Sequence, residues 1–96
     1  MPDTLDVPRI DEDELLGTLR DDLYSVIVWN DDVNTFAHVI TALVEIFGHS
    51  HARAEFLAWR VHNAGKAVVA VRPKDEAVAG MQALHRRGIQ ASVEPA

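Results

Sequence analysis

Apolar and polar residues alternate along the chain in segments that predict strands and helices. Residues 24–29, YSVIVW, are β-branched and aromatic, and this run is too short for an ordinary helix, so it predicts a strand. From Thr35 onward, apolar residues recur every three or four positions until Gly48, which predicts a helix ended by a glycine. We expect Asp32 or Asn34 to cap the start of this helix.

A second helix is predicted between Ser50, a suitable N-terminal cap, and Gly65. Its expected inward stripe consists of Ala54, Leu57, Ala58 and Val61. Residues 66–72, KAVVAVR, then predict the second strand of the sheet.

The third helix is expected to start at Pro73 and to end before Gly88. Acidic residues lie in its first turn and basic residues in its last turn, and both complement the helix dipole. Its expected inward stripe consists of Ala77, Val78, Met81, Leu84 and His85. Residues 89–93, IQASV, predict a third strand with its alternate residues, beginning at Ile89, on one side.

The predicted order βααβαβ indicates the α+β class, with a three-stranded antiparallel sheet and three helices on one face. We assign this small domain to residues 23–96. Residues 1–22 carry eight acidic residues against two arginines, which accounts for the whole net charge of −6. A segment with that charge and few large apolar residues cannot bury enough surface to offset its ordering entropy, so we predict a disordered acidic N-terminal extension.

Composition narrows the classes of function. The chain has 96 residues and no cysteine, which excludes disulfides, thiolate metal sites and a cysteine nucleophile. Acidic and basic residues balance after residue 22, so the domain lacks the basic excess that nucleic-acid binding needs. No signal peptide opens the sequence, and no apolar run approaches the roughly 20 residues that span a bilayer. We therefore expect a cytoplasmic protein without a membrane partner.

Three polar residues, Asn30, Asp31 and Asp32, follow directly on the first predicted strand. A turn and a helix cap can explain such residues, but one cap needs only one of them. His62 lies at the edge of the inward stripe of the second helix, and we expect it to be turned away from solvent. An isolated histidine there is more often a packed residue than a ligand.

Metal binding and catalysis have weaker support in the sequence. His49 and His51 form an HxH pair, but no third ligand follows at a defined spacing that would indicate zinc. The sequence contains no GxSxG, phosphate-binding loop or HExxH motif, and adjacent aspartates do not by themselves provide an acid and a base with separated pKa values. We expect no enzymatic activity, no cofactor and no metal.

A primary ammonium group suits the polar cluster better. It has three N–H donors and no acceptor, and carboxylates, an amide oxygen and a neutral imidazole can together satisfy all three. The predicted helices place Phe36, Val39, Ala58 and Val61 next to this cluster. An ammonium beside an apolar hole describes an N-terminal residue with a hydrophobic side chain.

The segments YSVIVWNDDVNTF and ARAEFLAWRVHNAGKAVV resemble the ClpS adaptor family, in which a strand ends in NDD and a helix ends in V-H-x-x-G-K-A. The resemblance covers about residues 24–94. It implies an adaptor that binds substrates with a destabilising N-terminal Phe, Leu, Tyr or Trp. The resemblance further implies delivery of these substrates to a Clp-family AAA+ unfoldase, of the ClpA or ClpC type, and its protease.

The resemblance also implies a role for each matching residue. Asn30, Asp32 and His62 would hydrogen-bond the substrate α-ammonium, and Asp31 would add negative potential or a further contact. The hydrophobic pocket would be lined by Val28, Trp29, Asn34, Phe36, Val39, Ala58, Val61 and Ile89. Asp75 would contact the unfoldase, and the N-terminal extension would couple binding to delivery.

Three positions depart from the family pattern. Ala58 and Phe36 stand where methionine is common, and the smaller Ala58 predicts a looser pocket that admits Ile, Val or Trp more readily. Gly80 stands where some members carry a lysine, so contact with the unfoldase would be weaker or made to a different Clp chaperone. A glycine inside a helix also suggests close packing at that point.

Phe56 and Trp59 project from the side of the second helix away from its inward stripe. Scattered exposed apolar residues are normal, but these two could also form a patch for self-association or for a partner. The alternative to an adaptor for N-terminal residues is therefore a ClpS-like docking module that binds a partner protein through a helix face.

Overall fold

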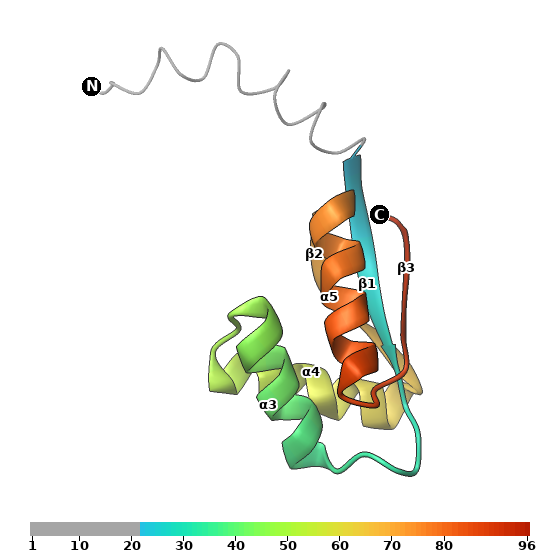
Figure 1. The fold of residues 1–96 in the computed structure, drawn as a ribbon. Helices are drawn as coiled ribbons and strands as arrows, with labels where there is room; N and C mark the ends of the chain where they lie inside the picture. The colour runs from blue at the N-terminus through green and yellow to red at the C-terminus, as the bar shows by residue number, and fades with distance from the viewer. Residues whose placement is uncertain (1–21) are drawn as a thin grey trace, which may run out of the picture.

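A computed structural model of the chain describes residues 22–96. The elements follow in the order β1 (Leu23–Trp29), α3 (Phe36–Phe47), α4 (His51–Ala64), β2 (Lys66–Pro73), α5 (Lys74–Arg86) and β3 (Ala91–Pro95). This order confirms the predicted βααβαβ arrangement and the α+β class (Figure 1). The predicted acidic extension, apart from its last residue, lies outside the described part of the chain.

The sheet has the strand order β2-β1-β3, with β1 in the centre and both neighbours antiparallel to it. Figure 1 shows α5 lying along one face of this sheet, while α3 and α4 pack across its lower end. The chain returns at its end to the start of β1, where the Ala96 amide donates to the Leu23 carbonyl at 3.0 Å. From there β1 runs through the centre of the sheet to its other end, where the loop that precedes α3 begins.

Side-chain alternation along β1 separates a covered face of the sheet from an open face. Val26 and Val28 are fully buried in the core cluster beneath the helices. Trp29 and the β2 residues Val68 and Val71 are exposed. The helices thus bury one face of the sheet and leave apolar side chains on its other face.

A β-bulge interrupts the alternation on β2. Val26 pairs with Ala70, whereas its neighbour Ile27 pairs with Val68, so Val69 is the extra residue. Val69 and Ala70 are both buried, which a regular two-residue alternation would not allow.

The starts of the first two helices are fixed by hydroxyl caps. Thr35 is the N-cap of α3, with its hydroxyl accepting from the His38 amide, so the predicted cap at Asp32 or Asn34 was wrong. The polar residues before Thr35 form a separate turn, described below, that ends one residue too early to cap the helix. The predicted cap at Ser50 is confirmed, because its hydroxyl accepts from the Arg53 amide.

The sequence predicted the buried face of α4 correctly but that of α5 only in part. The four predicted residues of α4 are its four buried residues. On α5 the buried residues are Ala77, Gly80 and Leu84, whereas His85 is exposed and bonds the Ala91 carbonyl through Nε2. The prediction for His85 was therefore wrong, because its ring turns to the Ala91 carbonyl at the start of β3 and does not pack in the core.

Gly80 lies against the aromatic ring of Phe47 at the end of α3. A Cβ atom at this position would stand 2.5 Å from Phe47 Cε1, which is closer than real Cβ contacts allow. The close packing expected at this glycine is confirmed.

Two element boundaries differ slightly from the prediction. Pro73 is the last residue of β2 and precedes α5, and β3 begins at Ala91 and not at Ile89.

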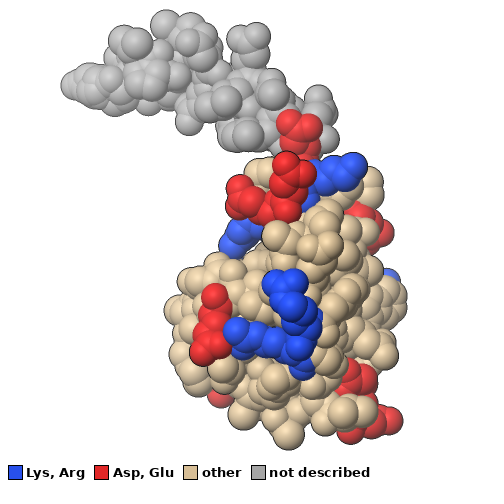
Figure 2. Space-filling view, viewed as in Figure 1, with Lys and Arg blue, Asp and Glu red and all other residues tan. Residues whose placement is uncertain are grey.

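Charged groups of both signs are interspersed on the face shown in Figure 2. Basic side chains gather near the centre of this face, and an acidic group lies directly beside them. The structure also contains an ion pair between Arg87 Nη1 and Glu45 Oε1, which are 2.8 Å apart. None of the helices within residues 22–96 has both the length and the apolar character needed to cross a membrane.

Candidate functional site

A cleft of about 410 Å³ lies between the loop after β1, the start of α3 and the C-terminal half of α4. Its wall is polar on the loop side and apolar on the helix side. The lining residues are Asn30, Asp31, Asp32, Asn34, Thr35, Phe36, Val39, Ala58, Val61 and His62. The structure thus brings together all four residues predicted to bind an ammonium group and five of the eight predicted for a hydrophobic pocket.

Asp31 organises the loop on the polar side of the cleft. Its Oδ1 accepts hydrogen bonds from the backbone amides of Val33 and Asn34, at 2.9 and 2.8 Å. Its Oδ2 accepts a third bond from Asn34 Nδ2 at 2.8 Å. The backbone and side-chain amides of Asn34, with a smaller effect from the Val33 amide, hold the pKa of the Asp31 carboxyl below its ordinary value. Both oxygens of this carboxylate are occupied in forming the turn.

The next aspartate is in a different situation. Within residues 22–96, no hydrogen bond or ion pair engages the carboxylate of Asp32 or the side-chain amide of Asn30. The backbone of Asn30 is held in place, because its amide donates to the Gly65 carbonyl just after α4 at 2.9 Å. This bond fixes the loop beside the end of the helix that carries His62.

His62 differs from three other histidines of the domain. The Nε2 atoms of His38, His49 and His85 each lie 2.7 to 2.8 Å from a backbone carbonyl oxygen. No such partner is found for the His62 ring among the described residues. Its ring instead meets Phe36 edge to face, with centroids 6.0 Å apart. Its side chain is exposed, so the expectation that it is turned away from solvent was wrong, because it stands at the mouth of the cleft.

The apolar side of the cleft is formed by two helices. Ala58 and Val61 reach it from the buried face of α4, where each is nearly fully covered. Val39 and Phe36 come from the first turn of α3, and 38% of Phe36 remains exposed. Ala58 is the smallest side chain of this apolar wall.

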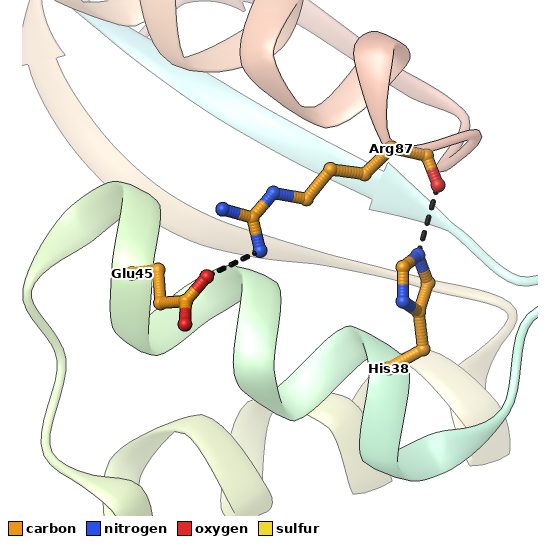
Figure 3. Close-up of polar contacts among 3 residues, drawn as sticks. All are labelled: His38, Glu45 and Arg87. Carbon is orange, nitrogen blue, oxygen red and sulfur yellow. Dashed lines mark hydrogen bonds and ion pairs between the residues drawn. The ribbon is translucent and has the colours of Figure 1, made fainter.

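The turn after α5 anchors the loop and α3 from behind. Asn34 Nδ2 donates to the Gly88 carbonyl at 2.9 Å, in addition to its bond with Asp31. Figure 3 shows the second anchor, in which His38 Nε2 lies 2.8 Å from the Arg87 carbonyl oxygen while the Arg87 side chain pairs with Glu45. Two segments of the cleft are therefore tied to one turn that is distant in sequence.

Three residues predicted for the pocket do not line this cleft. Val28 is 1% exposed and faces the core, because β1 directs it beneath the helices. Trp29 points to the opposite face of the sheet, where its Nε1 donates to Ser92 Oγ at 2.9 Å. Ile89 is buried, and with Trp29 it borders a separate and wider depression of about 570 Å³ beside His85.

The remaining predicted residues fall outside the cleft. Asp75 is exposed in the first turn of α5. His49, half of the HxH pair, is engaged with the Val69 carbonyl at 2.7 Å. Among residues 22–96 no three His, Asp or Glu side chains are grouped so that they could hold a metal ion.

Thr35 lines the cleft and was missed as a site residue, although its position after the NDD motif indicates a cap.

A comparison with protein families gives one match that spans most of the chain. Residues 19–94 match the model of the family described as ATP-dependent Clp protease adaptor protein ClpS. The matched segment includes the loop after β1, the cleft and all of α5.

Curated proteins of the same description are similar to this chain over most of its length. The ATP-dependent Clp protease adapter protein ClpS of Mycobacterium leprae (strain TN) is 37% identical over 68 residues, which are 71% of this chain and 63% of that protein. The ClpS protein of Nocardia farcinica (strain IFM 10152) is also 37% identical over 68 residues, or 71% of this chain and 64% of its own length. The match therefore spans less than two thirds of these two relatives. For the ClpS protein of Mycobacterium tuberculosis (strain ATCC 25618 / H37Rv), the identity is 34% over 76 residues, covering 79% of this chain and 75% of the relative.

A solved structure has the same fold. The ClpS2 protein of Agrobacterium tumefaciens, determined with bound L-phenylalaninamide, superposes with a TM-score of 0.69 at 26% sequence identity. The superposition covers 79% of this chain and 99% of that protein.

Proposed function

The chain belongs to the ClpS family, and from that premise we propose that it is an adaptor for substrates with a hydrophobic N-terminal residue. The cleft binds the first residue of the substrate, and the adaptor delivers the substrate to a Clp-family AAA+ unfoldase of the ClpA or ClpC type and its protease. The protein carries out no chemical step itself. One observation supports this most strongly: Asn30, Asp32 and His62 line one cleft together with an apolar wall, and their side chains have no hydrogen-bond partner within residues 22–96.

The polar side of the cleft suits an α-ammonium group. The Asp32 carboxylate, the Asn30 amide oxygen and a ring nitrogen of His62 can each accept one of the three N–H donors of an ammonium. A free α-amino group is largely protonated near neutral pH, so it brings a positive charge to the polar side of the cleft. Acetylation of the amino group removes the charge and two of the three donors, so it should abolish this set of bonds.

Asp31 contributes by shaping the loop. Its oxygens are already bonded to Val33 and Asn34, and it adds negative potential without being needed as a direct ligand. These bonds support Asp32, and not Asp31, as the residue that makes the direct charge contact.

The apolar side of the cleft suits the side chain of the first residue. Val39, Ala58 and Val61 present hydrocarbon surface next to the polar loop. That the ClpS2 protein of similar fold was determined with L-phenylalaninamide supports an N-terminal aromatic residue as ligand. Because Ala58 is smaller than the methionine common at this position in the family, we further propose that Ile, Val and Trp are admitted together with Phe, Leu and Tyr.

Delivery to the unfoldase would use surfaces outside the cleft. Asp75 is exposed at the start of α5 and is available for contact with the unfoldase. The acidic residues 1–22 precede β1 in the sequence and would couple binding to delivery.

The proposal is tested by titrating fluorescent peptides that are identical except for the first residue, each with a free and an acetylated amino terminus. We expect Phe and Leu peptides with a free amino group to bind and the acetylated forms not to bind. Equal binding of the free and acetylated forms would overturn the ammonium site. If no peptide bound in either form, the docking-module alternative would take its place.

A further inference from the structure

Trp59 is an exposed aromatic residue one helical turn before His62. Its side chain is 59% exposed, although indole is among the side chains that gain most from burial. Residues three positions apart on a helix are surface neighbours, with Cβ atoms about 5–6 Å apart. Trp59 therefore stands beside the residue that forms the mouth of the cleft.

We propose that Trp59 is a specificity-determining residue that contacts the second or third residue of a bound substrate and favours an apolar or aromatic side chain there. This inference rests on the proposed function, because it needs the first residue to be held in the cleft. It extends the substrate class from one N-terminal residue to a short hydrophobic N-terminal segment.

The reach of the substrate chain supports this contact. An ammonium bonded to His62 stands about 3 Å from its ring nitrogen, and the next Cα atoms follow at steps of 3.8 Å along the peptide. In an extended peptide the second and third Cα atoms therefore lie within about 8 and about 12 Å of the His62 ring nitrogen. The neighbouring indole, which starts about 5–6 Å away and extends from the helix, covers part of that range.

The other exposed aromatic residues do not share this position. Phe56 lies a further turn back, and its ring is already covered by the Arg60 guanidinium at 6.0 Å. Trp29 has its indole N–H bonded to Ser92 and its ring beneath Lys66 Nζ at 4.8 Å, on the open face of the sheet. Within residues 22–96, no hydrogen bond or cation contact engages the indole of Trp59. Of the two tryptophans, only Trp59 is beside the cleft and available to a ligand.

The chemistry of the surroundings predicts which side chains are favoured. An indole face attracts apolar and aromatic groups, with about 0.5–1.5 kcal/mol for an aromatic pair. An acidic side chain next to the bound ammonium would meet the negative potential of Asp31 and Asp32. We therefore expect Trp or Leu at the second or third position to bind more tightly than Ala, and Asp to bind less tightly.

The test compares the full-length protein with Trp59→Ala and Trp59→Phe in titrations of Phe-initiated peptides carrying Ala, Leu, Trp or Asp at the second or the third position. Phe56→Ala serves as the matched control, because Phe56 is 53% exposed on the same helix. L-phenylalaninamide, which ends after its first residue, is used as a competitor. We expect Trp59→Ala to remove a two- to tenfold preference for Leu or Trp, while Trp59→Phe keeps part of it. Phe56→Ala should keep the wild-type preference for Leu or Trp. The Trp59 variants should bind L-phenylalaninamide with the wild-type affinity.

Two outcomes would overturn the inference alone. The first is that wild-type protein binds all Phe-initiated peptides equally whatever follows. The second is that Trp59→Ala weakens L-phenylalaninamide as much as the longer peptides, which would indicate a structural role. If the wild-type protein bound no Phe-initiated ligand at all, both the inference and the proposed function would fail.

Discussion

The Asp31 carboxylate accepts a hydrogen bond from Asn34 Nδ2 at 2.8 Å, and the same Nδ2 donates to the Gly88 carbonyl at 2.9 Å. One side-chain amide thereby links the loop after β1 to the turn after α5. This link and two backbone amides occupy Asp31, whereas the adjacent carboxylate of Asp32 lines the cleft and has no hydrogen-bond or ion-pair partner within residues 22–96. In the proposed function the two neighbouring aspartates would serve two purposes, Asp31 in shaping the loop and Asp32 in binding the ligand.

Substituting the two aspartates separately should separate stability from binding. Asp32→Asn removes the charge that faces the ligand, and we expect about a 10- to 100-fold loss of affinity for a Phe-initiated peptide. Its free energy of unfolding should change by less than about 0.5 kcal/mol. Asp31→Asn should lower the free energy of unfolding by about 1 kcal/mol, because an amide at this position would direct its own N–H₂ group against Asn34. Urea unfolding and peptide titration of both variants check this, and the reverse assignment of the two effects would contradict it.

The dependence of stability on pH should reflect Asp31. Hydrogen bonds to the charged form lower the pKa of this carboxyl in the folded protein, so its contribution is fully present above the unfolded-state pKa of about 3.9. That contribution is lost as the pH falls through the lower folded-state pKa. The difference in unfolding free energy between wild type and Asp31→Asn should therefore be constant from pH 5 to 7 and should shrink below about pH 4. A difference that stays constant down to pH 2 would show that the charge of Asp31 is not involved.

The size of residue 58 should control which first residues are accepted. Ala58→Met adds apolar volume to the cleft wall, and we expect it to weaken peptides that begin with Ile, Val or Trp by about tenfold relative to Phe and Leu peptides. Ala52→Met, at an exposed position of the same helix, is the matched control. The measurement is a set of peptide titrations with each variant. An unchanged order of preference in Ala58→Met would show that this wall does not set specificity.

Gly80 should be intolerant of even a methyl group. Alanine gains about 1 kcal/mol over glycine in a helix, but a Cβ at this position would stand 2.5 Å from Phe47 Cε1. Displacing a packed ring typically costs 1–3 kcal/mol, so we expect Gly80→Ala to lower the midpoint of thermal unfolding. Ala79→Gly, at an exposed position of the same helix, calibrates the helix propensity alone. A raised midpoint for Gly80→Ala would mean that Phe47 moves aside without cost.

Local patterns in the sequence predicted most of the fold because they depend on near neighbours. The stripe of α4, for example, follows from helical spacing, and its four predicted residues are its four buried ones. The glycine that ends α3 is equally local, because Gly48 adopts the left-handed conformation that favours this residue. The cap of α3 was missed, since four other cap-forming residues, Asn30, Asp31, Asp32 and Asn34, precede Thr35 and only the hydrogen bonds in the structure decide among them.

Features that depend on distant segments could not be predicted. The bulge at Val69 arises from pairing with β1, and KAVVAVR alone does not reveal it. The position of Ile89 depends on how α5 packs on the sheet, which placed this residue in the core and not in the cleft. The link from Asn34 to Gly88 joins residues 54 positions apart, so no local spacing could indicate it.

The ligand site itself can be located by NMR. The backbone amide spectrum of the isotope-labelled protein would be recorded during titration with L-phenylalaninamide and, separately, with 3-phenylpropanamide, which has the same ring and amide but no amino group. We expect L-phenylalaninamide to shift the amide signals of Asn30, Asp32, Ala58 and His62, and 3-phenylpropanamide to leave them unchanged at the same concentration. Equal shifts with both compounds, or shifts confined to the depression beside Trp29 and His85, would contradict an α-ammonium site in the cleft.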